Sequence, residues 1–298
     1  MDIYGVIGWP VKHTLSPFMH NAAFKKLGIE ATYTAFEVPP EKLEDFILNR
    51  KDVAGFNITI PHKIKAREIL KKYFHVVNSL PYPYYDMMTD AVNTVKRNGD
   101  DIEYCNTDPI GFRHSLVNDL KLEKTKGKTA LIIGCGGASR AVVAELVVPA
   151  NYIKKIYLYD INKETVDSTK RHYSGLGNKI KFIYNTKDML ELKDELDLLV
   201  NASPVGMGEG DERLAAPKDL LNKGEGLYVF DLVYNRKTRL FKEASALECH
   251  VVDGSGMLAA QGAFSFSLWT GTSVPVGKIV EIMKSAINKA LIHKTSMT

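Results

Sequence analysis

The sequence lacks the features that mark several specialised classes of protein. Cysteine is scarce: Cys105, Cys135 and Cys249 lie far apart, with no CxxC pair and no histidine at ligand spacing. We therefore expect neither a disulfide framework nor a metal site, and this cysteine usage suits a reducing cytoplasm. No apolar run reaches the ~18–20 residues that span a bilayer, and the N-terminus lacks the basic start and apolar core of a signal peptide. Neither a membrane partner nor export is expected.

An excess of charge of one sign is also absent. The 39 Lys and Arg residues nearly balance the 35 Asp and Glu residues, which leaves a formal net charge of +4, and the basic residues are scattered. Nucleic acid is therefore not an expected partner, whereas a mildly positive field favours anionic small molecules. The 298 residues, 45% of them hydrophobic, suit two globular domains. Monomer and homodimer both stay open.

The first 109 residues alternate apolar runs with helical patterns. Ser16 is expected to cap the first helix, with Pro17 in its first turn. Such alternation predicts parallel strands with helices on the faces of the sheet. The expected strands are residues 3–7, 33–38 and 54–60.

A hairpin and a loop complete this part of the chain. Asn98-Gly99-Asp100 separates two strand-like runs, and Asn-Gly supplies the positive φ of a hairpin turn. Residues 78–88 fit neither helical nor strand periodicity and are predicted to form an irregular loop. We therefore predict an N-terminal αβ domain with a mixed sheet over residues 1–109.

A glycine turn opens the second half of the chain. The apolar run 130–133 leads directly into Gly134-x-Gly136, with the small residue Ser139 at the third position of the pattern. Strand, turn and helix in this order present backbone N–H groups to a dinucleotide pyrophosphate. Asp160 ends the next strand, where an acid that binds the adenosine ribose is expected. A carboxylate there repels a 2′-phosphate, so NAD is favoured over NADP, although Lys163 could offset the repulsion.

The pattern of strands after this turn extends the domain. Strand-like runs alternate with helical ones up to about residue 254, which predicts a doubly wound, Rossmann-like α/β domain over residues 110–255. The expected strands are residues 155–159, 180–183, 196–200 and 227–232. The helical segment 256–298 is expected to pack back on the first domain.

Eight short motifs follow one another along the chain, at residues 8–21, 57–63, 90–94, 106–108, 134–140, 201–207, 231–234 and 254–263. In this order they resemble the shikimate dehydrogenase family, also described as shikimate/quinate 5-dehydrogenases. Thr14 stands where the family pattern has Ser, and Asp90 where it has Gly.

The resemblance implies reversible, NAD(P)-dependent reduction of 3-dehydroshikimate to shikimate, in the biosynthesis of chorismate and aromatic amino acids. It implies that Lys63 and Asp108 flank the reacting hydroxyl group as the catalytic pair. Substrate contacts are implied for Thr14, Ser16 and Tyr234 at the carboxylate and for Thr59, Asn93 and Gln261 at the ring hydroxyls. Cofactor contacts are implied for Gly134, Cys135, Gly136, Gly137, Ala138, Ser139, Arg140, Asp160, Leu232 and Gly254.

Several alternatives stay open from the sequence. Quinate could replace shikimate as the substrate. Thr14 and Asp90 differ from the residues of the family motifs, and Asp160 favours NAD over NADP. A ligand-sensing protein without turnover is the alternative from another class, and the retained Lys63 and Asp108 argue against it. The sequence does not decide which of these two residues moves the proton.

Overall fold

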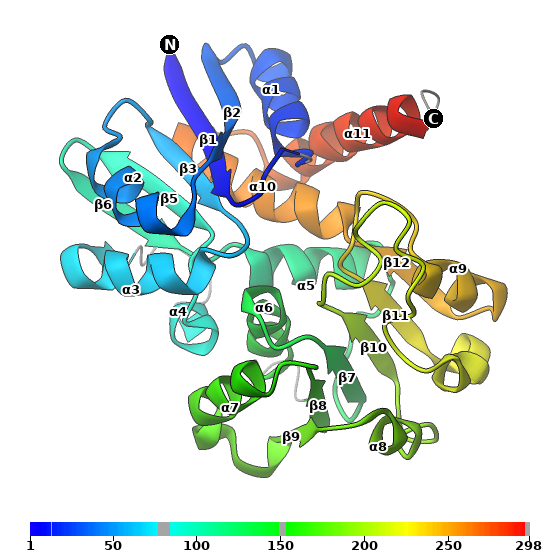
Figure 1. The fold of residues 1–298 in the computed structure, drawn as a ribbon. Coiled ribbons are helices and arrows are strands. Elements are labelled where there is room, and N and C mark those ends of the chain that lie inside the picture. The colour runs from blue at the N-terminus through cyan, green and yellow to red at the C-terminus, as the bar shows by residue number, and fades with distance from the viewer. Residues whose placement is uncertain (13, 77–83, 149–152, 296–298) are drawn as a thin grey trace. The chain divides into compact units, whose positions relative to one another are not determined.

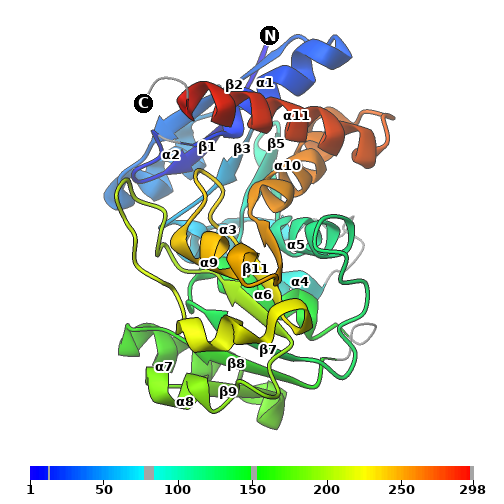
Figure 2. The same cartoon turned by 90° about the vertical axis from the view of Figure 1, so that its right-hand side faces the viewer.

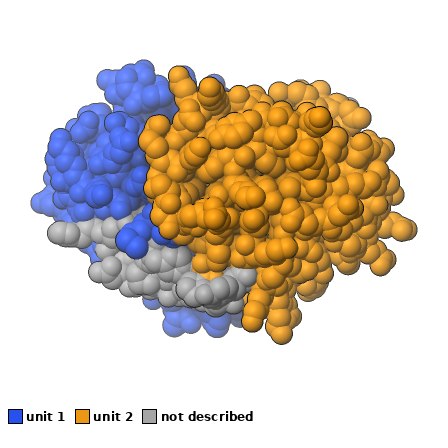
Figure 3. Space-filling model, turned by 90° about the horizontal axis from the view of Figure 1, so that it is seen from below, with its two compact units in different colours: residues 1–112, 257–298 blue, residues 113–256 orange. Residues whose placement is uncertain are grey.

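Two compact units make up the described chain. Unit 1 contains residues 1–112 and 257–298, and unit 2 contains residues 113–256 (Figure 3). The chain passes between the units within two helices, α5 (Asp108–Asn118) and α10 (Ser255–Thr270). The computed structural model describes residues 1–12, 14–76, 84–148 and 153–295. Within these ranges no helix is long and apolar enough to cross a membrane.

Unit 1 is built on a six-stranded mixed sheet in the order β2-β1-β3-β5-β6-β4 (Figure 1). The β1/β2, β1/β3 and β4/β6 pairs are parallel, and the β3/β5 and β5/β6 pairs are antiparallel. The predicted mixed sheet is therefore confirmed, and Gly99 has the positive φ expected of the hairpin turn. The strands are β1 (Asp2–Gly8), β2 (Ala31–Glu37), β3 (Gly55–Ile58), β4 (His75–Val76), β5 (Thr94–Asn98) and β6 (Asp101–Cys105).

Helices cover this sheet and bury an apolar core. Phe46, Ile47, Ile69 and Leu70 of α2 and α3 pack against apolar strand residues in one cluster. In both views α11 lies beside α1 and α10 (Figures 1 and 2). The remaining helices of the unit are α1 (Ser16–Leu27), η1 (Pro40–Lys42), α2 (Leu43–Asn49), α3 (Lys63–Tyr73), α4 (Tyr84–Thr89) and α11 (Val276–Thr295).

Two local predictions for unit 1 are wrong. Ser16 does not cap α1: it is the first helical residue, and its backbone N–H donates to Thr14 Oγ1 at 3.2 Å. The N-cap position belongs to Leu15, whose apolar side chain cannot accept a hydrogen bond, and Thr14 supplies an acceptor instead. Pro17 lies in the first turn as expected. The irregular loop predicted for residues 78–88 is in part the helix α4, whose buried Tyr85 provides packing that periodicity does not show. Residues 77–83 lie outside the described ranges.

Unit 2 contains a six-stranded parallel sheet in the order β12-β11-β10-β7-β8-β9. Counted along the unit, this is the doubly wound order 3-2-1-4-5-6 read from the other edge, and the strand order reverses between β7 and β10. The Rossmann-like prediction is confirmed. The strands are β7 (Thr129–Ile133), β8 (Lys155–Tyr159), β9 (Ile180–Ile183), β10 (Leu198–Asn201), β11 (Tyr228–Asp231) and β12 (His250–Asp253).

The helices of unit 2 connect these parallel strands. In such a sheet every carboxyl end lies at one edge, so the turns after β7, β8, β10, β11 and β12 gather there. The helices are α6 (Gly137–Leu146), α7 (Lys163–His172), η2 (Ser174–Lys179), α8 (Thr186–Leu190), η3 (Lys218–Gly226) and α9 (Arg239–Ala246).

Candidate active site

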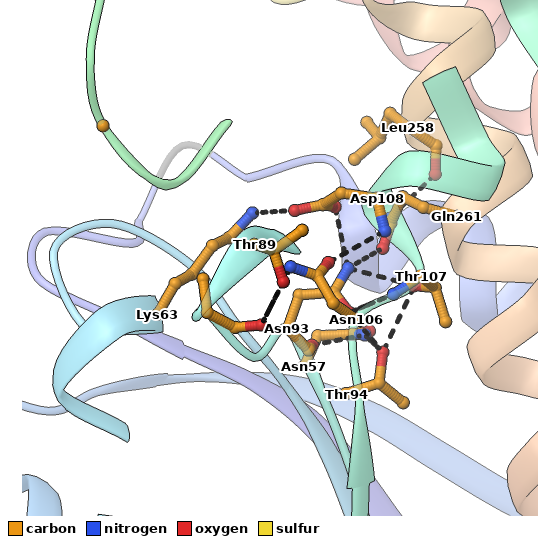
Figure 4. Close-up of polar contacts among 12 residues, drawn as sticks. Asn57, Lys63, Thr89, Asn93, Thr94, Asn106, Thr107, Asp108, Leu258 and Gln261 are labelled. Carbon is orange, nitrogen blue, oxygen red and sulfur yellow. Dashed lines mark hydrogen bonds and ion pairs between the residues drawn. The ribbon is translucent and has the colours of Figure 1, made fainter. Parts of the chain in front are cut away.

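Lys63 and Asp108 form a close ion pair in unit 1. Lys63 Nζ lies 2.6 Å from Asp108 Oδ2, and their side chains are 16% and 6% exposed (Figure 4). Each residue is the first of a helix, α3 and α5 respectively. Asp108 suits that position because a helix N-terminus favours negative charge, and its backbone N–H donates to Asn106 Oδ1 at 3.0 Å. The pair is largely shielded from water, with the ammonium the more exposed partner.

Asn93 joins this pair to Gln261. The Asn93 amide nitrogen donates to Asp108 Oδ1 at 2.7 Å and to Gln261 Oε1 at 3.2 Å (Figure 4). Asn93 and Gln261 come from the start of β5 and from α10, and both side chains are buried. The close approach of α5 to α10 depends on Gly111, where a Cβ would lie 2.7 Å from the Gln261 Cβ. The structure thus brings four of the predicted site residues into one polar cluster.

The other predicted substrate residues lie elsewhere. Thr14 Oγ1 donates to Ser16 Oγ at 3.1 Å, so these two hydroxyls form a pair at the start of α1. Thr59 follows β3, and its methyl group fits closely over Gly8 at the end of β1. Among the described residues, no hydrogen bond joins these three to the Lys63 cluster. Tyr234 belongs to unit 2, in the segment after β11.

The glycine turn of unit 2 follows β7 directly. Gly134 has φ +106°, and a Cβ there would lie 2.8 Å from the Ala202 carbonyl oxygen, so only glycine fits without strain. Gly136 faces open space, and no side chain caps the N-terminus of α6 at this residue. The N–H groups at the start of α6 are thus left for an external acceptor. This arrangement fits a dinucleotide pyrophosphate.

Asp160 directly follows β8 and is hydrogen-bonded to the same turn. Its Oδ2 accepts the Cys135 N–H at 2.8 Å, and its Oδ1 accepts the Asn162 N–H at 2.9 Å. The carboxylate therefore holds the backbone of the glycine turn in place through the Cys135 N–H. Burial, with a smaller contribution from Asp160, raises the pKa of the Cys135 thiol to about 12, so the thiol is un-ionised at neutral pH. In the same segment Ser139 Oγ donates to the Gly136 carbonyl, and the Arg140 side chain is buried.

The ends of β10, β11 and β12 complete this edge of the sheet. Asp231 is fully buried and accepts hydrogen bonds from Asn201 Nδ2 at 2.9 Å and from the Thr238 hydroxyl. Burial raises the pKa of Asp231, and these bonds oppose the rise. A Cβ at Gly254 would collide with the Leu232 carbonyl, so glycine is required where these two predicted cofactor residues meet. No cluster of residues suited to a metal occurs in the described part of the chain.

Comparisons with known proteins decide the family. A profile described as "Shikimate dehydrogenase substrate binding domain" matches residues 6–95, and one described as "Shikimate 5'-dehydrogenase C-terminal domain" matches residues 254–286. Shikimate dehydrogenase (NADP(+)) of Methanopyrus kandleri is 39% identical over 297 residues, covering 96% of this chain and 94% of that protein. The chain belongs to the shikimate dehydrogenase family.

Solved structures of family members share the fold over nearly the whole chain. A crystal structure of a shikimate dehydrogenase in complex with NADP+ has a TM-score of 0.82 at 34% identity and covers 98% of this chain and 96% of its own. Shikimate 5-dehydrogenase of Listeria monocytogenes, solved with shikimate and NAD, has a TM-score of 0.77 at 28% identity, with coverages of 95% and 96%. The resemblance and the fold class inferred from the motifs are confirmed.

Sequence reasoning missed a group of buried polar residues behind the cluster. Asn57, Thr94 and Thr107 lie inside family motifs, but the motif matches assigned no role to them. Ser265 lies outside the motifs, and its signal is its place four residues after Gln261, on the same face of α10. The members of this group are Tyr33, Asn57, Thr94, Thr107 and Ser265.

Proposed function

We propose that the chain is a shikimate dehydrogenase, which interconverts shikimate and 3-dehydroshikimate with a nicotinamide dinucleotide. The observation that carries this proposal is the shielded Lys63–Asp108 pair, bonded through Asn93 to Gln261. A cation that holds an exchangeable proton, surrounded by neutral amides, suits the hydroxyl and ketone of a polyol. Unit 1 would bind the substrate and unit 2 the dinucleotide.

Lys63 is proposed as the group that moves the proton. Both Asp108 oxygens face donors, Lys63 Nζ and Asn93 Nδ2, so the carboxylate acts as an acceptor that orients the ammonium. In oxidation, the substrate hydroxyl transfers its proton to the Lys63 amine as its carbon loses a hydride. In reduction, the Lys63 ammonium returns a proton to the ketone oxygen. When bound, the dinucleotide accepts or supplies that hydride.

The remaining substrate contacts are proposed from the family motifs. The paired hydroxyls of Thr14 and Ser16 would bind the substrate carboxylate together with the Tyr234 hydroxyl. Asn93 and Gln261 would bind ring hydroxyls beside the reacting carbon, with Thr59 at the other side of the ring. Neutral donors suit a polyol because they bind hydroxyl groups without the cost of desolvating a further charge.

We propose NADP as the cofactor, held by the turn from Gly134 to Arg140, with Leu232 and Gly254 near the nicotinamide. The preference for NAD inferred from Asp160 lacks support from the relatives, which are named for NADP(+). Both Asp160 oxygens accept backbone N–H groups, so this carboxylate is partly compensated inside the turn. Lys163, the exposed first residue of α7, is the proposed partner of the 2′-phosphate.

The cofactor proposal can be tested with a single substitution. Lys163→Ala should raise KM for NADP by roughly fivefold to tenfold, the value of one exposed phosphate contact, with no change for NAD. Lys170→Ala, in the last turn of the same helix, is the matched control. A wild-type kcat/KM higher for NAD than for NADP would instead restore the ribose-binding role of Asp160.

The substrate proposal is tested by initial rates of the wild-type protein. Shikimate and quinate are each offered with NADP and with NAD, and nicotinamide reduction is followed. We expect shikimate with NADP to have the highest kcat/KM. A higher kcat/KM for quinate would make the chain a quinate dehydrogenase, and binding of shikimate without turnover would favour a sensing protein.

A cytoplasmic location accompanies the proposal. All three cysteines are free and buried, as expected where thiols stay reduced. A fusion to a fluorescent protein that localised outside the cytoplasm would contradict it.

A further inference from the structure

The buried group behind the active site forms a hydrogen-bonded chain that ends on Asp108. Tyr33 OH lies 2.7 Å from Asn57 Oδ1, and Asn57 Nδ2 lies 3.2 Å from Thr94 Oγ1. Thr94 Oγ1 lies 2.8 Å from Asn93 Oδ1, and Asn93 Nδ2 lies 2.7 Å from Asp108 Oδ1. Each member is buried, so water does not compete for these groups.

The orientations of the Asn93 and Asn57 amides follow from groups that can act in only one way. The backbone N–H of Thr107, 2.8 Å from the Asn93 side chain, can only donate, so it must face the amide oxygen. The Asn93 nitrogen is therefore the atom that faces Asp108. Likewise, Asn57 lies 3.0 Å from the Asn93 carbonyl, which can only accept, so Asn57 presents its nitrogen there and its oxygen to Tyr33.

Thr94 has one hydroxyl proton, and its neighbours decide where it points. Asn57 Nδ2 donates to Thr94 Oγ1, and Asn93 Oδ1 accepts from it. Two further hydroxyls lie near it, Ser265 Oγ at 2.7 Å and Thr107 Oγ1 at 3.3 Å, and Ser265 also faces the Gln261 carbonyl at 3.1 Å. Along the chain from Tyr33 to Asp108, the donor of each bond is thus the group farther from the carboxylate. Figure 4 shows the part of this chain from Asn57 to Asp108. Bonds that point the same way polarise one another.

We propose that Thr94 is a positioning residue for the reaction, acting through Asn93 on Asp108. Its hydroxyl, held by Asn57 and Ser265, keeps the Asn93 nitrogen directed at the carboxylate, and Asp108 in turn orients the Lys63 ammonium. This inference rests on the proposed function of the Lys63–Asp108 pair. Thr94 itself is fully buried and adjoins the pair only through Asn93 and Thr107.

The test compares Thr94→Val with Thr94→Ser in the full-length protein. Valine keeps the shape of threonine and removes the hydroxyl, whereas serine keeps the hydroxyl. With shikimate and NADP saturating, Thr94→Val should lower kcat about tenfold, the effect of one hydrogen bond. KM for NADP should stay unchanged, and Thr94→Ser should keep kcat within about threefold of wild type. Thr129→Val, a buried threonine in β7 of unit 2, is the matched control and should keep wild-type kcat.

The Asp108→Asn background separates positioning from general loss of structure. If Thr94 acts through the carboxylate, Thr94→Val should not lower the residual kcat of Asp108→Asn any further. Additive losses, an equal loss in Thr94→Ser, or a kcat of Thr94→Val within twofold of wild type would overturn the inference. These outcomes differ from failure of the proposed function, in which the wild-type protein itself would not oxidise shikimate and both proposals would fall.

Discussion

Asp108 of unit 1 and Asp231 of unit 2 are both buried, and the two carboxylates have different partners. Asp108 of unit 1 faces the Lys63 ammonium at 2.6 Å, whereas Asp231 of unit 2 accepts from neutral groups of Asn201 and Thr238. Burial raises the pKa of Asp231, and hydrogen bonds from Thr238, Val233 and Asn201 oppose the rise. Burial of a carboxylate therefore does not by itself identify a catalytic residue. In the proposed function, the adjoining Lys63 cation distinguishes Asp108 from Asp231, whose bonds join the end of β10 to the segment after β11.

The largest expected effect comes from removing that cation. Lys63→Ala should lower kcat at least ~10²-fold, because a positioned acid/base contributes ~10²–10⁴ in rate. The dinucleotide should bind as it does to wild type, since the glycine turn belongs to unit 2. Initial rates and a fluorescence titration with NADPH measure the two properties. Turnover near the wild-type value would remove Lys63 from the mechanism.

The same substitution at the two aspartates should have different consequences. Asp108→Asn should lower kcat ~10²-fold, because the Lys63 ammonium loses the charge that orients it. Asp231→Asn should keep kcat within a few-fold, because an amide oxygen can still accept from Asn201 and its nitrogen can donate to Thr238. Urea unfolding should show a change of about 1 kcal/mol for Asp231→Asn. Equal losses of kcat at both positions would abolish the distinction.

Acid should destabilise unit 1 through His20. This side chain is fully buried, its ring stacks on Tyr33 at 4.1 Å between centroids, and burial lowers its pKa to about 3. Because the folded pKa lies below the unfolded value of about 6.5, the unfolded chain binds the proton first. Stability is therefore unaffected well above pH 6.5 and falls as the pH drops toward 3.

The size of this effect can be measured against a variant without the imidazole. Between pH 7.5 and pH 5, His20 should cost about 2 kcal/mol of unfolding free energy. His20→Phe keeps an aromatic ring against Tyr33 and should lose about that much of the acid sensitivity. Identical slopes of stability against pH in the two proteins would show that His20 is not the group responsible.

The smallest expected effect is at Asp90. Its φ is +43°, a left-handed conformation that suits the glycine of the family pattern better than aspartate. Asp90→Gly should raise the unfolding free energy by no more than about 1 kcal/mol. The segment runs beside α3, where the Val92 N–H donates to the Lys63 carbonyl at 3.0 Å. The ratio of quinate to shikimate turnover in this variant tests whether the Asp90 carboxylate affects the choice of polyol.

Much of the fold could be predicted because its signals are local. The strands at residues 155–159 and 180–183 were predicted at the observed bounds, and the glycine turn lies where strand and helix patterns meet. The strand β12 was missed because its apolar run is only two valines between polar residues, and each of its four residues is exposed or half-buried. The helix α4 was missed because its packing on buried Tyr85, not its periodicity, stabilises it.

Of the candidate site, only the residues that lie in short motifs were predicted from the sequence. Motif matches named Lys63 and Asp108, which the fold brings to 2.6 Å. They could not show the chain behind them, because Asn57 and Ser265 are 208 positions apart and meet only in the folded unit. They gave Asp231 no role, because its bonds to Asn201 and Thr238 form only in the folded unit. Such roles depend on tertiary contacts.

The transfer of deuterium from shikimate to NADP tests the central claim most directly. Shikimate carrying deuterium at the carbon that bears the reacting hydroxyl is incubated with the wild-type protein and NADP, and the reduced dinucleotide is analysed by NMR. We expect one deuterium on the nicotinamide ring for each 3-dehydroshikimate formed, and ~10²-fold slower labelling with Lys63→Ala. An unlabelled nicotinamide ring, or equal rates in both proteins, would contradict it.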